Sequence, residues 1–185
     1  MRHLLLAMAV LPLASAARGA IAYTRFAHPK GDYVIEYPSN WKKSYGLQTV
    51  SLRPPGLDGK KAKVSLGRYP LGKGTPVKPE DFEKELLAQV GTLKRLDSQT
   101  SIDFAGHKVH RLALTETVAL TGSYGRRLTG PLQEVYVILP VDNSAYYVLK
   151  LEGIGDAFAI VLPEFDLITQ KLTLAAATPK APQPQ

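Results

Sequence analysis

The stretch "GDYVIEYPSNW", residues 31–41, combines an alternating apolar pattern with an abrupt stop. Tyr33, Ile35 and Tyr37 recur at every second residue, which is the period of a β-strand with one face on a hydrophobic core. Pro38 then ends the strand, because proline has no backbone N–H to donate and the polar pair after it favours a turn. We predict that Trp41, the only tryptophan of the chain, anchors this turn on the core.

Two further strands are expected after this stretch. Residues 49–56, "TVSLRPPG", place Val50 and Leu52 on one face before two prolines and a glycine end the run. Residues 61–69, "KAKVSLGRY", alternate apolar residues with lysine and serine. Alternation with period two, interrupted by turn residues, is typical of neighbouring antiparallel strands. The chain is therefore predicted to open as an antiparallel meander.

Two later segments have the period of a helix. In the first, Pro79 suits the first helical position, and the acidic residues after it complement the positive end of a helix. Its apolar residues recur at helical spacing: Phe82, Leu86, Val90 and Leu93. In the second, residues 156–174, Asp156 is the expected cap. Pro163 either lies in the first turn of a helix that begins near Leu162 or kinks a longer one.

The strands between these helices define the fold class. A tight reversal is expected at Ala105–Gly106. Residues 130–140 and 144–153 form a further strand pair, and both runs are apolar on both faces over much of their length. Such strands belong in the middle of a sheet that is covered on both sides. We therefore predict an α+β fold, a central antiparallel sheet with helices on both faces in an α/β/α sandwich.

The ends of the chain indicate an exported protein. Residues 1–16 have a basic start, an apolar run of about ten residues and the small-residue pattern "ASA", which is typical of a cleaved signal peptide. The chain contains no cysteine, so it has neither a lipidation site nor disulfides. We predict a single globular domain over residues 17–174, a disordered tail over residues 175–185, and a periplasmic or secreted location.

The formal net charge of +7 indicates a basic surface. Such a charge suits a solvated surface, an acidic protein partner or an anionic membrane surface. Nucleic acid is not expected, because an exported chain without a recognisable reading motif does not fit that class. The oligomeric state has no signature in the sequence.

No enzyme class is indicated. The chain has no cysteine, no G-x-S-x-G elbow and no phosphate-binding glycine loop, so we predict a protein without catalytic residues. Asp103 and His107 flank the expected turn and are the one candidate for a surface metal, but no carboxylate spacing supplies further ligands. Neither a metal nor a cofactor is therefore predicted.

The most suggestive polar segment is "TGSYGRRLTG", residues 121–130. Its glycines allow the loop to bend, Tyr124 offers an aromatic ring, and Arg126 and Arg127 suit forked contacts with carboxylates or phosphates. Lys42 and Lys43, just after Trp41, are the second group of candidate contact residues. A plain flexible connection remains the alternative for the loop.

Taken in order, four segments resemble the PsbP-like family: "GDYVIEYPSNW", "IDFAGHKVHRL", the pair "QEVYVILP" and "AYYVLKLEG", and "FDLITQKLTL". The family is named for an extrinsic protein of photosystem II and includes Ran-binding nuclear proteins and exported bacterial proteins. The resemblance covers residues 23–174 and implies an antiparallel sheet with helices on both sides, used mostly to bind proteins or assist assembly. It does not imply photosynthesis.

We therefore expect an exported, non-enzymatic binding or assembly module. Its partner would be an envelope or extracellular protein with an acidic surface. The alternative is a small-ligand or lipid-binding protein, in which five aromatic residues line a concave pocket. These are Tyr33, Tyr37, Trp41, Tyr146 and Tyr147.

Overall fold

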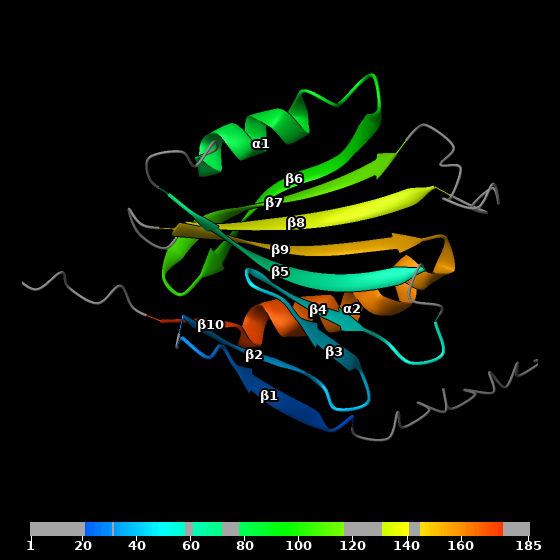
Figure 1. Ribbon diagram of the computed structural model, residues 1–185. Helices are drawn as coiled ribbons and strands as arrows, with labels where there is room; N and C mark the ends of the chain where they lie inside the picture. The colour runs from blue at the N-terminus through cyan, green and yellow to red at the C-terminus, as the bar shows by residue number, and fades with distance from the viewer. Residues whose placement is uncertain are drawn as a thin grey trace, which may run out of the picture.

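The computed structural model describes residues 21–30, 32–57, 61–71, 78–116, 131–140 and 145–175, which form two antiparallel sheets and two helices (Figure 1). The larger sheet has seven strands in the order β3-β4-β5-β9-β8-β7-β6. Its strands are β3 (Lys42–Tyr45), β4 (Thr49–Arg53), β5 (Ala62–Pro70), β6 (Lys94–Phe104), β7 (His107–Glu116), β8 (Leu132–Pro140) and β9 (Ala145–Ile154). The short strand β3 and the long strand β6 are therefore its two edges.

The smaller sheet joins the two ends of the described chain. It has the order β1-β2-β10, made by β1 (Tyr23–Ala27), β2 (Tyr33–Pro38) and β10 (Thr173–Leu174). The predicted meander is therefore wrong in its first member: β2 pairs with β1 and β10, and β3 takes its place beside β4. The chain passes from the smaller to the larger sheet at the turn after Pro38. Trp41 is buried at this turn, and the next strand, β3, lies in the larger sheet.

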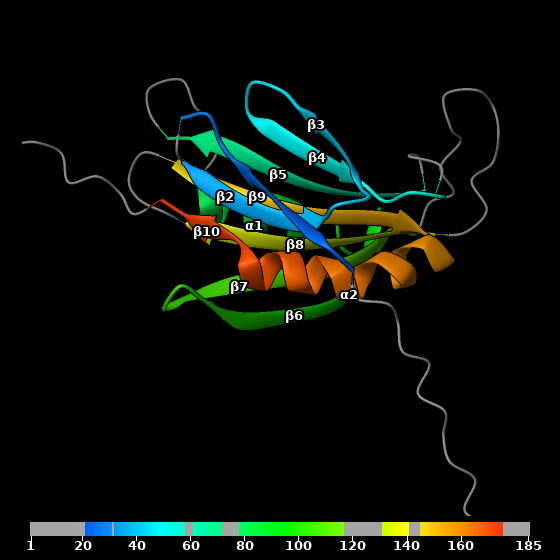
Figure 2. The same ribbon diagram turned by 90° about the horizontal axis from the view of Figure 1, so that it is seen from below.

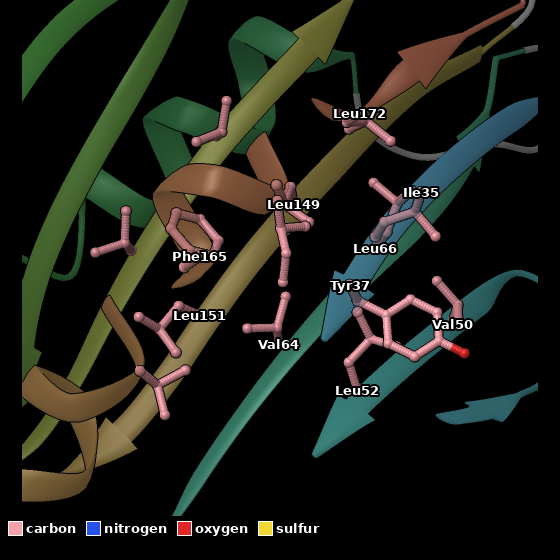
Figure 3. Close-up of a cluster of buried hydrophobic side chains, with 14 of the residues drawn as sticks. Ile35, Tyr37, Val50, Leu52, Val64, Leu66, Leu149, Leu151, Phe165 and Leu172 are labelled. Carbon is pink, nitrogen blue, oxygen red and sulfur yellow. The ribbon is translucent and has the colours of Figure 1, made fainter. Parts of the chain in front are cut away.

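The main hydrophobic core lies between the larger sheet, β2 and the second helix, α2 (Asp156–Lys171). The predicted inward residues of β2 are confirmed, since Tyr33, Ile35 and Tyr37 are buried in this cluster. Figure 3 shows Phe165 of α2 near Leu149 of β9, in the middle of the cluster. Phe165 has no exposed surface, and truncating such a residue to alanine typically costs about 3–5 kcal/mol.

A second cluster involves the first helix, α1 (Pro79–Leu87). Leu86 packs there with Tyr136 of β8 and Tyr146 of β9, and Phe82 lies against it. The helix starts at Pro79 as predicted, with acidic residues in its first turn. It ends at Leu87, earlier than the apolar spacing suggested, and Leu93 is exposed.

The second helix settles the alternatives for Pro163. It runs from Asp156 to Lys171 with Pro163 inside, so the long helix is correct. The cap position belongs to Gly155, whose positive φ of 55° favours glycine, and Asp156 is the first helical residue. The reversal at Ala105–Gly106 is also confirmed, with positive φ at both positions, as a tight two-residue hairpin turn requires.

The structure therefore shows an α+β fold with a large antiparallel sheet and two helices. No helix in the described part of the chain is long and apolar enough to cross a membrane. The predicted signal peptide, the loop at residues 121–130 and tail residues 176–185 lie outside the described residues.

Candidate functional site

Edge strand β3 carries the best candidate for a contact surface. All four of its residues are exposed, and its partner strand β4 covers one edge only. The two lysines predicted to make contacts, Lys42 and Lys43, are its first two residues. Because side chains alternate along a strand, Lys42 and Ser44 share one face and Lys43 and Tyr45 share the other.

The Lys42 face is positively charged. Arg53 of β4 lies directly opposite Lys42 in the sheet, and its Nη1 lies 3.4 Å from Ser44 Oγ, a long contact. Within the described residues, no carboxylate lies within ion-pair distance of Lys42 or Arg53. Two like charges on neighbouring strands repel each other, so an acidic partner group placed between them would be stabilised.

The Lys43 face combines charge with aromatic surface. The Nζ atom of Lys43 lies 3.9 Å from the centre of the Phe26 ring on β1, and the Phe26 and Tyr45 ring centres are 5.5 Å apart. Tyr45 is 43% exposed, and Leu47 at the β3–β4 turn is almost fully exposed. Exposed aromatic and apolar groups beside cations are typical of protein-contact surfaces.

Buried polar groups hold Tyr45 in place. Its hydroxyl is 2.9 Å from Nε2 of His28, which is buried and stacks on the ring of Tyr33. The other ring nitrogen of His28 lies 3.1 Å from a carboxylate oxygen of Asp32, an ion-pair contact that lacks hydrogen-bond geometry. Arg68 of β5 approaches the same carboxylate at 3.5 Å. The exposed phenol is thus positioned by residues of the β1–β2 connection and of β5.

No pattern in the sequence indicated this contact between His28 and Tyr45. His28 follows β1 of the smaller sheet and Tyr45 ends β3 of the larger one, 17 positions away, and neither residue belongs to a motif. Only the packing of β1 and β2 against the β3 edge brings them together.

A second group of charges lies on the larger sheet, and there the charges are paired. Glu134 of β8 is buried and accepts bonds from Lys94, from Lys150 at 2.7 Å and from the Tyr136 hydroxyl at 2.9 Å. Lys150 also lies 2.8 Å from Glu152, which in turn is 2.8 Å from Lys63 of β5. This set of Lys63, Lys94, Glu134, Tyr136, Lys150 and Glu152 is called the buried ionic network below.

The protonation states of this network follow from its pairing. Burial alone would raise the pKa of Glu134, but Lys150 and Lys94 outweigh it and hold the pKa below its ordinary value. The same balance of burial against Lys150 and Lys63 lowers the pKa of Glu152. Burial would lower the pKa of Lys150, but Tyr136 and Glu134 raise it. Glu134, Lys150 and Glu152 are therefore charged at neutral pH, and each of them has a partner of opposite charge.

The remaining predicted residues fall into three groups. Tyr124, Arg126 and Arg127 lie outside the described residues. Asp103 pairs with Lys108 at 2.9 Å, not with His107, and the described part of the chain holds no cluster of three metal-ligating residues. The five aromatic residues of the small-ligand alternative are buried in the two hydrophobic clusters.

The comparisons with known proteins show the fold. No protein-family model matches the chain, and no curated protein matches its sequence. A cyanobacterial PsbP from Synechocystis superposes with a TM-score of 0.53 at 13% identity, over 86% of this chain and 96% of that one. The Ran-binding protein Mog1p of Saccharomyces cerevisiae superposes with a TM-score of 0.55 at 7% identity, over 85% and 97%. The chain has the PsbP-like fold, as the sequence resemblance predicted.

Proposed function

We propose that this protein is an exported binding or assembly module whose β3 edge contacts an acidic surface on an envelope or extracellular protein. The observation that carries the proposal is the group of residues at that edge. Exposed Lys42 and the half-buried Arg53 of β4 have no carboxylate of the described residues within ion-pair distance, and Tyr45 is held beside Lys43. Most other cationic side chains of the described residues are already paired with carboxylates. We therefore expect an acidic partner to form its new ion pairs at this edge.

The geometry favours a protein over other acidic partners. An edge strand presents unpaired backbone N–H and C=O groups, which an extended segment of a partner can satisfy, whereas a lipid headgroup or phosphate would use only the charges. The apolar surface of Leu47 and the ring of Tyr45 also suit a protein surface. The name of the similar yeast protein, which binds Ran, supports a protein-binding use of the fold.

Two further parts of the proposal have indirect support. We propose that the protein acts without catalysis, since the ionisable groups of the buried ionic network are paired with one another. We also propose the α/β/α layering, which is supported by the alternation along β8: Val135 and Val137 belong to the α2 cluster, and Tyr136 and Ile138 to the α1 cluster. No observation in the described residues favours the small-ligand alternative.

Photo-crosslinking in the native envelope tests the proposal. A benzoylphenylalanine placed at position 45 is expected to crosslink one protein, and the Lys42→Glu/Lys43→Glu variant is expected to lose that product. Lys78→Glu/Lys84→Glu makes the same change in net charge on and beside α1 and is the matched control, which should retain it. Crosslinks to lipid alone, or equal loss in both variants, would disprove the proposed surface.

A further inference from the structure

The second edge of the larger sheet is β6, the longest strand of the described chain. It has 11 residues, whereas β3 has 4. Strand β7 pairs with one side of β6, and no described strand pairs with the other. Figure 2 shows β6 at the margin of the sheet, with no labelled helix or strand beyond it. Among the described elements, the outer side of this strand therefore has no backbone partner.

The middle of β6 lacks the features that protect edge strands from pairing with another chain. Protected edges are typically short or carry lysine, proline or a bulge. Strand β3 fits this description, because it is short and begins with two lysines. Residues 98–102 of β6, "SQTSI", contain neither a charged residue nor a proline. The register shifts between Leu96 and Ser98, which leaves residues 98–104 as a regular, unprotected edge.

The β6–β7 turn determines which backbone groups of this edge are free. Phe104 and His107 are the first and fourth residues of the turn, the two that the hydrogen bond of a β-turn joins. Antiparallel strands alternate bonded and non-bonded residue pairs, so every second residue from Phe104 back to Ser98 bonds to β7. The residues between them direct their N–H and C=O groups away from β7. These are Gln99, Ser101 and Asp103.

The free groups are arranged symmetrically about Ser101. A second copy of β6, related by a two-fold axis through Ser101 and perpendicular to the sheet, would run antiparallel to the first. Ser101 would then lie opposite its own counterpart, and Gln99 opposite the counterpart of Asp103. In this register every outward N–H and C=O of residues 98–104 has a partner. A closed two-fold dimer needs a self-complementary surface of this kind.

The side chains are compatible with the same register. The amide of Gln99 donates one hydrogen to Glu83 at 2.9 Å, and its second hydrogen is available for the carboxylate opposite. Thr100 would face the counterpart of Ile102, and both residue types are common in strands. Asp103 is the only charged residue of 98–104 and is paired with Lys108 at 2.9 Å. No like charges within this segment would therefore meet across the axis.

We propose that β6 is a homodimer interface, in which two copies of this chain pair antiparallel through residues 98–104 and join their larger sheets into one. The symmetry about Ser101 favours a second copy over a strand of another protein, which gains nothing from it. The paired segment is shorter than a standard interface, so the dimer should be weak and dependent on concentration. The inference goes beyond the proposed function, because the dimer carries a β3 edge at each end of the joined sheet.

Sedimentation velocity of the purified full chain tests the dimer. Between about 10 µM and about 1 mM, we expect a reversible equilibrium of monomer and dimer. Ser101→Lys places two like charges opposite each other at the axis and should weaken the dimer at least about tenfold. Ser44→Lys makes the same change in charge on β3 and should leave the dimer intact. A chain that stays monomeric over this range, or equal weakening by both variants, would overturn the proposal.

Disulfide formation tests the register. The chain contains no cysteine, so introduced thiols report the pairing directly. Thr100 and the counterpart of Ile102 would form a non-bonded pair with Cα atoms about 4.5 Å apart, within disulfide range. Each residue would lie more than about 7 Å from its own counterpart, which is beyond that range. A mixture of Thr100→Cys and Ile102→Cys should therefore crosslink, and neither variant alone should. Equal crosslinking of one variant alone would disprove the axis at Ser101.

Photo-crosslinking separates this inference from the proposed function. A dimeric chain without a crosslink from position 45 would disprove the β3 surface and leave the β6 dimer standing. A monomeric chain that retains this crosslink would overturn only the dimer. A benzoylphenylalanine at position 101 should crosslink to a second copy of the chain. A crosslink from position 101 to another protein instead would overturn the assignment of β6 as a homodimer interface.

Discussion

The buried ionic network and the β3 edge use the same kinds of residue in opposite ways. In the network, Glu134 lies beneath the surface and each of its oxygens is bound by a lysine. At the edge, Lys42 is exposed and Arg53 is half-buried, and no carboxylate of the described residues lies within ion-pair distance of either. A buried charge without a partner of opposite charge destabilises the folded state strongly, whereas an exposed charge can remain unpaired with little loss of stability. The buried ionic network therefore stabilises the fold, whereas the β3 edge is available to bind a partner.

The largest expected effect comes from breaking the network. Glu134→Ala leaves Lys94 buried without its carboxylate, and removing one member of a buried pair costs about 3–5 kcal/mol. Chemical denaturation monitored by circular dichroism should show this loss in the free energy of unfolding. Glu80→Ala, on the exposed start of α1, is the control and should change it by less than about 0.5 kcal/mol. A small effect of Glu134→Ala would mean that the network does not stabilise the fold.

Acid should weaken the same region. Because the pKa values of Glu134 and Glu152 are lower in the folded state, their contribution to stability is present above the unfolded value of about 4.3 and is lost as the pH falls through the folded values. Thermal unfolding from pH 6 to pH 2 should show this loss, and Glu134→Gln should reduce the slope.

Glu116 provides the control for the acid experiment. Its pKa is raised by burial and by Glu134, so protonation of Glu116 favours the folded state and partly offsets the loss of stability in acid. Glu116→Gln removes this offset and should therefore make the loss of stability with falling pH slightly steeper, the opposite of the effect of Glu134→Gln. If both variants reduced the loss of stability with falling pH equally, the pH dependence would not arise from the pairing of Glu134.

A smaller effect is expected where the edge meets the core. Tyr45→Phe removes the hydroxyl that bonds to buried His28, which should cost about 1 kcal/mol, the usual worth of such a bond. The exposed ring stays in place, so partner crosslinking from a probe at position 47 should weaken only slightly. Tyr45→Ala also removes the contact with Phe26, and a larger loss of crosslinking there would show that the ring itself makes contact.

The smallest effect on stability is expected at the lysines of β3. Lys42→Glu and Lys43→Glu should each change the free energy of unfolding by less than about 0.5 kcal/mol, since both side chains are exposed and lack a described carboxylate partner. Differential scanning calorimetry measures this directly. A larger loss at Lys43 would show that its contact with the Phe26 ring stabilises the junction of β1 and β3.

The accuracy of sequence reasoning differed between these regions for a physical reason. Alternation in residues 33–38 predicted the buried face of β2 correctly, because the period of a strand is a local property. Strand β3 was not predicted, since its four residues are polar and exposed and show no such period. Lys42 and Lys43 were nevertheless named as candidate contacts from their position after Trp41, and the structure places them on an edge.

The sequence by itself determined the inward face of β2, the β6–β7 turn and the paired strands β8 and β9, because each follows from local period or turn chemistry. The PsbP-like fold was predicted by the resemblance of four segments to that family. Only the tertiary structure decided which charges are paired. Glu134 meets Lys94 across 40 residues, Arg111 meets Asp166 across 55, and His28 meets Tyr45 between two sheets. Such contacts depend on strand order and on the placement of α2, and no spacing along the chain encodes them.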